Sequence, residues 1–402
     1  MWKLKKAYYR TYQAIFNIGA RVLPWRKPER EETPGCIAKI PEYLAKSGAK
    51  KPMVVTDPGL VKAGVAPAVT AILDNAGIAY GYYDNVAPNP TVDMVNAVKE
   101  LYLKENCDSF IAIGGGSSMD TAKAAAAIIV KPNKTVNQLG GLLKVMKKIP
   151  PFIAVPTTAG TGSETTIAAL ITDPKTQHKY AVMDLCLIPK YAMLDANLTL
   201  GLPPHITSTT GMDALTHAVE AYVCWTYNTK ESLQFAEEAT KLIFENLEKA
   251  YNNGQDAEAR QNMMIASFKA GFAFTRAGVG NVHAIAHTLG GIYNTAHGLA
   301  NAVILPVVLE DYGEAVYPKL ARLAEIAGVK TDGTEAEKAK AFIQEIYDMN
   351  KRMNIPDGFD FIKEEDIPRM TKWAYAEANP IYPVPVLFNE EHFASVIRKI
   401  MK

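Results

Sequence analysis

The first half of the chain alternates short apolar segments with helical segments, and this alternation constrains the fold more than any other feature. Residues 52–57, 79–83, 110–113 and 152–155 have the apolar character of buried strands. Residues 61–76, 92–104 and 118–130 have helical periodicity and lie between them. Strands separated by helices run parallel, with helices on both faces of the sheet. We therefore predict an α/β domain built on a doubly wound parallel sheet.

The pattern changes at residues 201–205 (GLPPH), beyond which strand signals nearly vanish. Long helical periodicities follow, for example at 231–251, 257–274 and 317–327. A chain of 402 residues with 48% hydrophobic content can build two cores, because single cores stop growing near ~250–300 residues. We predict an α/β domain over 31–200, an all-helical domain over 201–402, and an N-terminal extension over 1–30.

Two loops rich in glycine, threonine and serine, residues 114–117 and 157–163, follow predicted strands. Glycines between a strand and a helix let backbone N–H groups approach an anion, and the helix N-terminus favours negative charge. Both loops fall at strand carboxyl ends, where doubly wound sheets bind ligands. The pattern is not G-x-G-x-x-G. It nevertheless indicates a cradle for the phosphates of a dinucleotide.

Asp57 ends the first predicted strand and is followed by Pro58. An acid at this place can accept hydrogen bonds from ribose and repel a 2′-phosphate, which would favour NAD(H) over NADP(H). The same Asp-Pro pair is also a good start for a helix. The two roles are compatible, and the sequence leaves both open.

A second cluster of polar residues lies beyond the boundary. Asp213 and His217 are four residues apart in a helical segment, His283 and His287 repeat this spacing, and His297 follows Gly290 and Gly291, which we expect to bend the chain. One carboxylate with several imidazoles suits Zn²⁺, Fe²⁺ or Mn²⁺. The alternative is a set of core histidines and helix hydrogen bonds. The spacing leaves open which of the last three histidines stays off the metal.

Charge and cysteine content narrow the class of partner. The net charge is +1, from 43 basic and 42 acidic residues, so no global field favours nucleic acid. The four cysteines lie far apart without a C-x-x-C pair, which indicates a reducing cytoplasm. No apolar run reaches the ~18–20 residues that span a bilayer. We expect a small-molecule partner and no transmembrane segment.

The first 22 residues form an amphipathic pattern that Pro24 ends. One helical stripe holds Leu4, Tyr8, Tyr12, Ile15, Gly19 and Val22, and the opposite side holds Lys3, Lys6, Arg10, Gln13, Asn17 and Arg21. A basic amphipathic helix can lie on a membrane surface or dock on a partner. Packing on its own protein or on a second subunit is the commoner arrangement, and we favour it.

Four segments together resemble the iron-containing (group III) alcohol dehydrogenases: GGGSSMDTAK at 114–123, PTTAGTGSE at 156–164, GMDALTHAVEAY at 211–222 and VHAIAHTLGGIYNTAHG at 282–298. The likeness covers about residues 35–400. It implies a homodimer with a dehydroquinate synthase-like two-domain architecture. It also implies a divalent metal, Fe²⁺ before Zn²⁺, with the ligands Asp213, His217, His283 and His297. His287 is then left near the nicotinamide, as a proton relay or as a wall of the substrate pocket.

The same resemblance places the nicotinamide dinucleotide against a set of residues in the first domain. These are Asp57, Asn89, Gly115, Gly116, Ser117, Asp120, Thr157, Thr158, Thr161 and Lys179.

The resemblance implies a metal-dependent alcohol dehydrogenase or aldehyde reductase that transfers hydride between a small alcohol and NAD(P) in the interdomain cleft. The alternative from another class is an NAD-dependent sugar-phosphate lyase or cyclase of the dehydroquinate synthase type. Those enzymes resemble the chain in architecture but have Glu in the first ligand position, where this chain has Asp213. A non-enzymatic assembly protein, the third possibility, would be expected to have lost its ligand residues.

Overall fold

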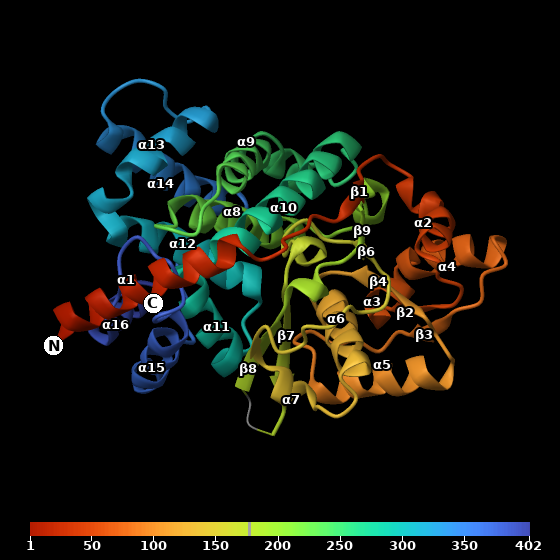
Figure 1. Ribbon diagram of the computed structural model, residues 1–402. Helices are drawn as coiled ribbons and strands as arrows, with labels where there is room; N and C mark the ends of the chain where they lie inside the picture. Colours follow the sequence, from red (N-terminus) through yellow and green to blue (C-terminus); the bar gives the residue numbers. More distant parts are fainter. Residues whose placement is uncertain (176–177) are drawn as a thin grey trace. The chain divides into compact units, whose positions relative to one another are not determined.

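The computed structural model describes residues 1–175 and 178–402, which divide into two compact units (Figure 1). An α/β unit contains residues 24–202 and 254–268, and a helical unit contains residues 1–23, 203–253 and 269–402. The N-terminal segment, which the sequence analysis separated as an extension, thus belongs to the helical unit. Residues 254–268 belong to the α/β unit although they lie beyond residue 200 in the chain.

The α/β unit contains nine strands and six α-helices among the described residues. They are β1 (Glu29–Glu31), α2 (Ile40–Ser47), β2 (Pro52–Val55), α3 (Pro58–Lys62), α4 (Val65–Asn75), β3 (Gly81–Tyr83), α5 (Val92–Lys104), β4 (Ser109–Gly114), α6 (Gly116–Val130), α7 (Val136–Leu139), β5 (Gly141–Leu142), β6 (Phe152–Pro156), β7 (Ala168–Asp173), β8 (His178–Met183) and β9 (Tyr191–Met193). Six strands form one sheet in the order β1-β9-β6-β4-β2-β3, all parallel. The predicted doubly wound parallel sheet is confirmed.

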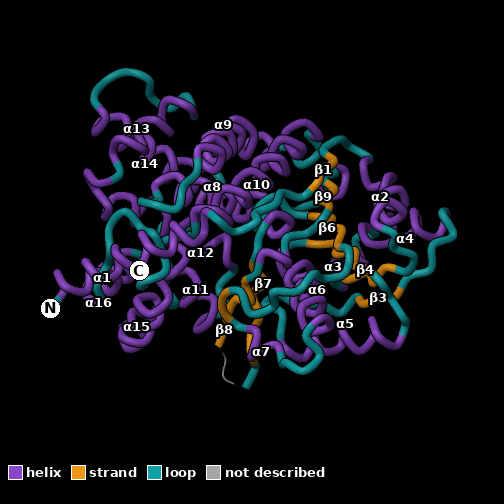
Figure 2. Tube along the Cα trace, in the orientation of Figure 1, coloured by secondary structure: helices purple, strands orange, loops and turns teal. Residues whose placement is uncertain are grey.

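Successive residues of the central strands enter different cores. In β4, Phe110 and Ala112 pack with α5 and α6, whereas Ile111 and Ile113 pack with α2 and α4. β2 and β6 divide their residues in the same way. A strand buried on both faces needs an unbroken apolar run, which explains the sequences PMVV and FIAVP. Figure 2 shows the strands between the two sets of helices.

One local expectation in this unit is wrong, and one pair of strands was not predicted. Residues 61–76 do not form a single helix, because Gly64 adopts a left-handed conformation (φ +77°) and separates α3 from α4. The antiparallel pair of β7 and β8, which forms a second small sheet with β5, was not predicted. Its residues alternate between buried and half-buried along β7, as in a strand that has only one face in the core.

The helical unit contains no strand among the residues that the structure describes. Its helices are α1 (Trp2–Arg21), α8 (Pro204–Val223), α9 (Lys230–Asn252), α11 (Asn281–Tyr293), α12 (His297–Tyr312), α13 (Tyr317–Ile326), α14 (Glu335–Arg352), α15 (Ile367–Ala378) and α16 (Glu390–Lys399). α10 (Ala257–Ala277) begins in the α/β unit and enters this one at Lys269. Within the described ranges, no helix is both long and apolar enough to span a bilayer.

The N-terminal helix α1 packs on its own protein, but through the face opposite to the one expected. Its buried residues are Tyr9 and Gln13, while the predicted apolar stripe is largely exposed, with Leu4 77% and Val22 83% accessible. Gln13 donates from Nε2 to the carbonyl oxygens of Pro380 and Tyr382 at 2.9 and 2.7 Å. Hydrogen bonds to backbone carbonyl groups, together with the packing of Tyr9 on Val384 and Leu387, therefore set the orientation of α1.

Candidate metal centre and cofactor edge

Three helices of the helical unit supply the candidate metal ligands. Asp213 and His217 lie one turn apart on α8, so their side chains leave the same face of the helix. His283 lies in the first turn of α11, and His297 is the first residue of α12. The sequence predicts a bend at Gly290 and Gly291, but α11 does not end there. It continues to Tyr293, and the bend comes at Asn294, which has a positive φ of 54°.

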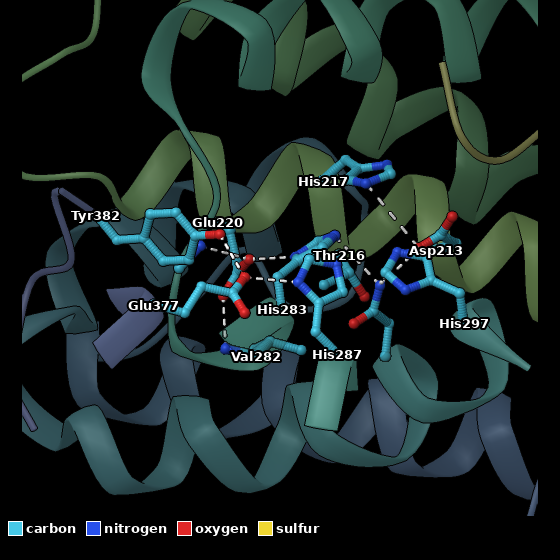
Figure 3. A network of polar contacts seen from close by, with 12 residues as sticks. Asp213, Thr216, His217, Glu220, Val282, His283, His287, His297, Glu377 and Tyr382 are labelled. Carbon is cyan, nitrogen blue, oxygen red and sulfur yellow. Dashed lines mark hydrogen bonds and ion pairs between the residues drawn. The ribbon is translucent and has the colours of Figure 1, made fainter. Parts of the chain in front are cut away.

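The four side chains converge on a single point. One donor atom from each of Asp213, His217, His283 and His297 lies within 4.8 Å of the other three. Oδ1 of Asp213 is 3.5 Å from Nε2 of His297 and 4.0 Å from Nε2 of His217. Three of the residues are buried and His297 is partly buried. Figure 3 shows His217 and His297 approaching Asp213 from two sides, with His283 next to them.

Asn301 lies one turn after His297 on α12. The contacts of its amide indicate whether the four candidate ligands suit a cation. Its Nδ2 donates to Oδ1 of Asp213 at 2.6 Å and lies 3.2 Å from Nε2 of both His283 and His297. Three lone pairs thus point at one positively polarised group, while Oδ1 of Asn301 has no hydrogen-bond partner. One carboxylate oxygen with three imidazole nitrogens is a donor set that suits Fe²⁺ or Zn²⁺. The residues present fit a divalent metal.

Glu220 fixes the orientation of His283. Its buried carboxylate lies 2.6 Å from Nδ1 of His283 and accepts hydrogen bonds from the backbone N–H groups of Gly280 and Val282, both at 2.8 Å. It therefore caps the N-terminus of α11 and turns Nε2 of His283 toward the other ligands (Figure 3). A carboxylate hydrogen-bonded to the far nitrogen of a metal-binding histidine is a recurrent arrangement.

Burial controls the protonation of this pair. It raises the pKa of Glu220 above its ordinary value, although the hydrogen bonds from Gly280, Val282 and His283 act to lower it. Burial, followed by the neighbouring histidines, holds the pKa of His283 well below its ordinary value. His283 is therefore neutral near pH 7, and a neutral imidazole has the free lone pair that a metal requires.

His287 lies next to the ligand group but outside it. Its Nδ1 is 2.6 Å from Oε1 of Glu377 on α15, and Oε1 also accepts a 2.6 Å hydrogen bond from the hydroxyl of Tyr382. Its ring stacks on that of His297 at 5.2 Å. Nε2 of His287 is buried and has no hydrogen-bond partner. The arrangement, visible in Figure 3, leaves this nitrogen available to a substrate.

Gly298 brings α12 close to α8. A Cβ built at this residue would lie 2.4 Å from the carbonyl oxygen of Thr209 and 3.3 Å from Cβ of Asp213. Only glycine fits a backbone contact this close. The His-Gly pair at 297–298 therefore carries both a candidate ligand and the packing contact that places it near Asp213.

The predicted cofactor residues of the α/β unit gather at one edge of its sheet. β4 lies between β2 and β6, and all three run parallel. Their carboxyl ends therefore place the glycine loop at 114–117 between Asp57 and the loop at 157–163. Cβ atoms at Gly115 and Gly116 would come within 3.2 and 3.1 Å of Thr158 and Thr161. The two loops are thus closely packed, with α6 starting at Gly116.

Several predicted cofactor residues have partners in the protein. Asp57 caps α3 by accepting from the N–H group of Leu60 at 3.0 Å, so the helix-start role is present. Asp120 is buried and accepts from Ser163 and from the N–H group of Leu170. Lys179 donates to Asn89 at 3.0 Å.

A parallel sheet with glycine-rich loops at its carboxyl edge and a buried group of one Asp and three His are the two parts expected of a metal-dependent dehydrogenase. Two family models match the chain: "Iron-containing alcohol dehydrogenase" over residues 32–196 and "Fe-containing alcohol dehydrogenase family, C-terminal" over residues 207–401. The chain belongs to the iron-containing alcohol dehydrogenase family. It is an oxidoreductase that acts on alcohols.

Individual relatives agree with this assignment. The chain is 40% identical to alcohol dehydrogenase 4 of Schizosaccharomyces pombe, over 87% of this chain and 83% of that protein. It is 38% identical to the NAD-dependent methanol dehydrogenase of Bacillus methanolicus, over 85% and 90%. A crystal structure of 1,3-propanediol oxidoreductase superposes with a TM-score of 0.90 at 33% identity, covering 94% of this chain and all of that one. These matches favour the dehydrogenase over the sugar-phosphate lyase alternative.

The sequence analysis missed four residues of the site, namely Glu220, Asn301, Glu377 and Tyr382. Two of them had a local signal: Glu220 lies three residues after His217, and Asn301 lies four after His297, so each shares a helix face with a ligand. Glu377 and Tyr382 had none. They meet His287 only because α15 and the segment after it pack on α11.

Proposed function

We propose that the protein is an NAD(H)-dependent alcohol dehydrogenase or aldehyde reductase whose Fe²⁺ is held by Asp213, His217, His283 and His297. The observation that carries the proposal is the convergence of three lone pairs on the Asn301 amide, with His217 within reach of the same point. Zn²⁺ fits the same donor set. The relatives reported above include a methanol dehydrogenase and a 1,3-propanediol oxidoreductase, so we propose a small alcohol or aldehyde as substrate.

The divalent ion would supply Lewis-acid stabilisation of negative charge on the substrate oxygen. The protein residues prepare this chemistry. Asp213 contributes one negative charge and the imidazoles none, so the site keeps a net positive charge when loaded. Glu220 holds His283 in position, and His287, held by Glu377, can pass the hydroxyl proton to or from the substrate through Nε2.

Purified protein, stripped of metal and then reloaded, tests this function. We expect oxidation of primary alcohols, followed by NADH absorbance, to return with Fe²⁺ and to a smaller or equal extent with Zn²⁺. Mg²⁺ should not restore activity, because it prefers oxygen ligands. Full activity in the stripped protein would refute the metal-dependent reaction.

His287→Ala is expected to lower kcat by about 10²-fold, the size of a lost general acid–base group, while metal content stays unchanged. If His287 is only a wall of the substrate pocket, KM will rise and kcat will stay near its original value. The matched control is His392→Ala, which removes a histidine of α16 that is paired with Asp311 and is not part of the ligand group.

Asp57 is proposed to set the preference for NAD(H). Asp57→Asn keeps an oxygen that can cap α3 but removes the charge that would repel a 2′-phosphate. The ratio of kcat/KM for NADH and NADPH should shift by about tenfold toward NADPH, which corresponds to ~1.4 kcal/mol. If the parent enzyme already uses NADH and NADPH equally, Asp57 serves only as the N-cap of α3. Asp57→Gly, which removes charge and cap together, should show the same shift.

We also propose a homodimer in a reducing cytoplasm. The family resemblance supports the dimer. The four cysteines, Cys36, Cys107, Cys186 and Cys224, form no disulfide with one another, and three of them are buried, which is compatible with a reducing compartment.

A further inference from the structure

The N-terminal helix α1 lies outside the segments that match the family and supplies no side chain to the site described above. It is attached to the helical unit along one face, where Tyr9 packs with Val384 and Leu387 and polar side chains form hydrogen bonds. Arg10 donates to the carbonyl oxygens of Val384 and Pro385 at 2.7 and 2.8 Å, and Asn17 donates to that of Thr226 at 2.8 Å. With the bonds of Gln13, these contacts fix which side of α1 faces outward.

The outward side is apolar. Its large residues are Met1 (98% exposed), Leu4 (77%), Tyr8 (60%), Ile15 (66%), Ile18 (69%) and Val22 (83%). Their spacing alternates between three and four residues, apart from Thr11 in the middle, so they form one continuous stripe along about 30 Å of helix. A soluble helix normally turns such a stripe to the core, and an exposed one marks an interaction surface.

The charge around the stripe has a single sign. Residues 1–28 contain seven basic and no acidic side chains, although the whole chain has nearly equal numbers of both. At 100° per residue, Lys3 and Arg21 fall along one edge of the stripe and Lys5 along the other. All three are exposed. An apolar stripe bordered by cations matches a surface that is apolar within and anionic at its rim.

We propose that α1 is a membrane-surface helix, which lies in the interface of an anionic lipid bilayer with its stripe among the acyl chains and Lys3, Lys5 and Arg21 at the headgroups. A bilayer with anionic lipid offers both apolar depth and negative charge. A second copy of α1 would bring five like charges against five, which disfavours pairing of the two stripes. Because α1 does not span a bilayer, attachment by one such helix is peripheral and reversible.

Flotation of the full-length protein with lipid vesicles tests this proposal. The vesicles contain phosphatidylcholine alone or phosphatidylcholine with phosphatidylglycerol. The variant Ile15→Asp/Ile18→Asp places charges on the exposed stripe, and Leu103→Asp is the matched control, since Leu103 is 55% exposed on α5 in the other unit. Melting temperature, dehydrogenase activity and mass by light scattering are measured for each protein. Point variants are used because deletion of α1 would also remove the bonds to residues 380–385.

The parent and Leu103→Asp should float with the anionic vesicles and not with the neutral ones. Ile15→Asp/Ile18→Asp should lose at least tenfold in vesicle binding, with melting temperature, mass and activity unchanged. Salt at 0.5 M should weaken binding of the parent. A parent that fails to bind anionic vesicles, or a double variant that binds as well as the parent, overturns the proposal. A double variant with lower mass would instead show that a second copy covers the stripe, which also overturns it.

Discussion

His283→Ala is expected to abolish metal binding and to reduce turnover by at least about 10³-fold. The ligand is lost from a buried site, and Lewis-acid stabilisation of several kcal/mol corresponds to this factor. Asp213→Ala should behave in the same way, because it removes the only carboxylate of the group. NAD affinity should remain largely intact in both variants, since the predicted cofactor residues belong to the α/β unit.

The control for these variants is His205→Ala. His205 lies in the first turn of α8, on the same helix as Asp213, but it is exposed and is not part of the ligand group. Metal content by elemental analysis, NAD titration and turnover are measured on all three proteins. A full complement of metal in His283→Ala and Asp213→Ala would contradict the assignment of the ligands.

Glu220→Gln is expected to weaken metal affinity by about 10–100-fold, the usual range when the partner of a metal-binding histidine is removed. An amide keeps one acceptor oxygen where the carboxylate has two, so its NH₂ group would face at least one of the donors of Gly280, Val282 and His283. The start of α11 should loosen, and His283 with it. Metal titration of stripped protein gives the affinity, and a thermal melt gives the stability.

Glu237→Gln is the matched control, because Glu237 is a helix carboxylate on α9 that accepts from Tyr222 and contacts no ligand. A purely structural role for Glu220 would lower the melting temperature and leave the metal affinity of the folded protein unchanged. That result would remove Glu220 from the metal centre.

The parallel sheet was predictable because β2, β4 and β6 are buried on both faces and need continuous apolar runs. The pair β7 and β8 was not predicted, because its alternating pattern gives a weaker signal than the apolar run of a buried strand. The break between α3 and α4 at Gly64 was not predicted, because helical periodicity continues across it. Strands buried on both faces were therefore predicted correctly, whereas half-buried strands and a break inside a helical pattern were not.

The candidate ligands were visible because two pairs at a spacing of four residues stand in helical segments. Which histidine stays off the metal was not predictable from spacing, since His283 and His287 have equivalent spacing on α11. In the structure, His283 rather than His287 lies in one group with Asp213, His217 and His297. The orientation of α1 was also not predictable from the sequence, because it depends on contacts of Tyr9, Arg10 and Gln13 with residues 380–387.

The most direct test of the central claim is a crystal of the Fe²⁺-loaded protein measured on both sides of the iron absorption edge. We predict one strong anomalous peak within about 2.0–2.3 Å of an oxygen of Asp213 and of Nε2 of His217, His283 and His297. The Asn301 amide should move away from the position of the peak. An anomalous peak bound by His287, or no peak among these four residues in an active protein, would contradict the account.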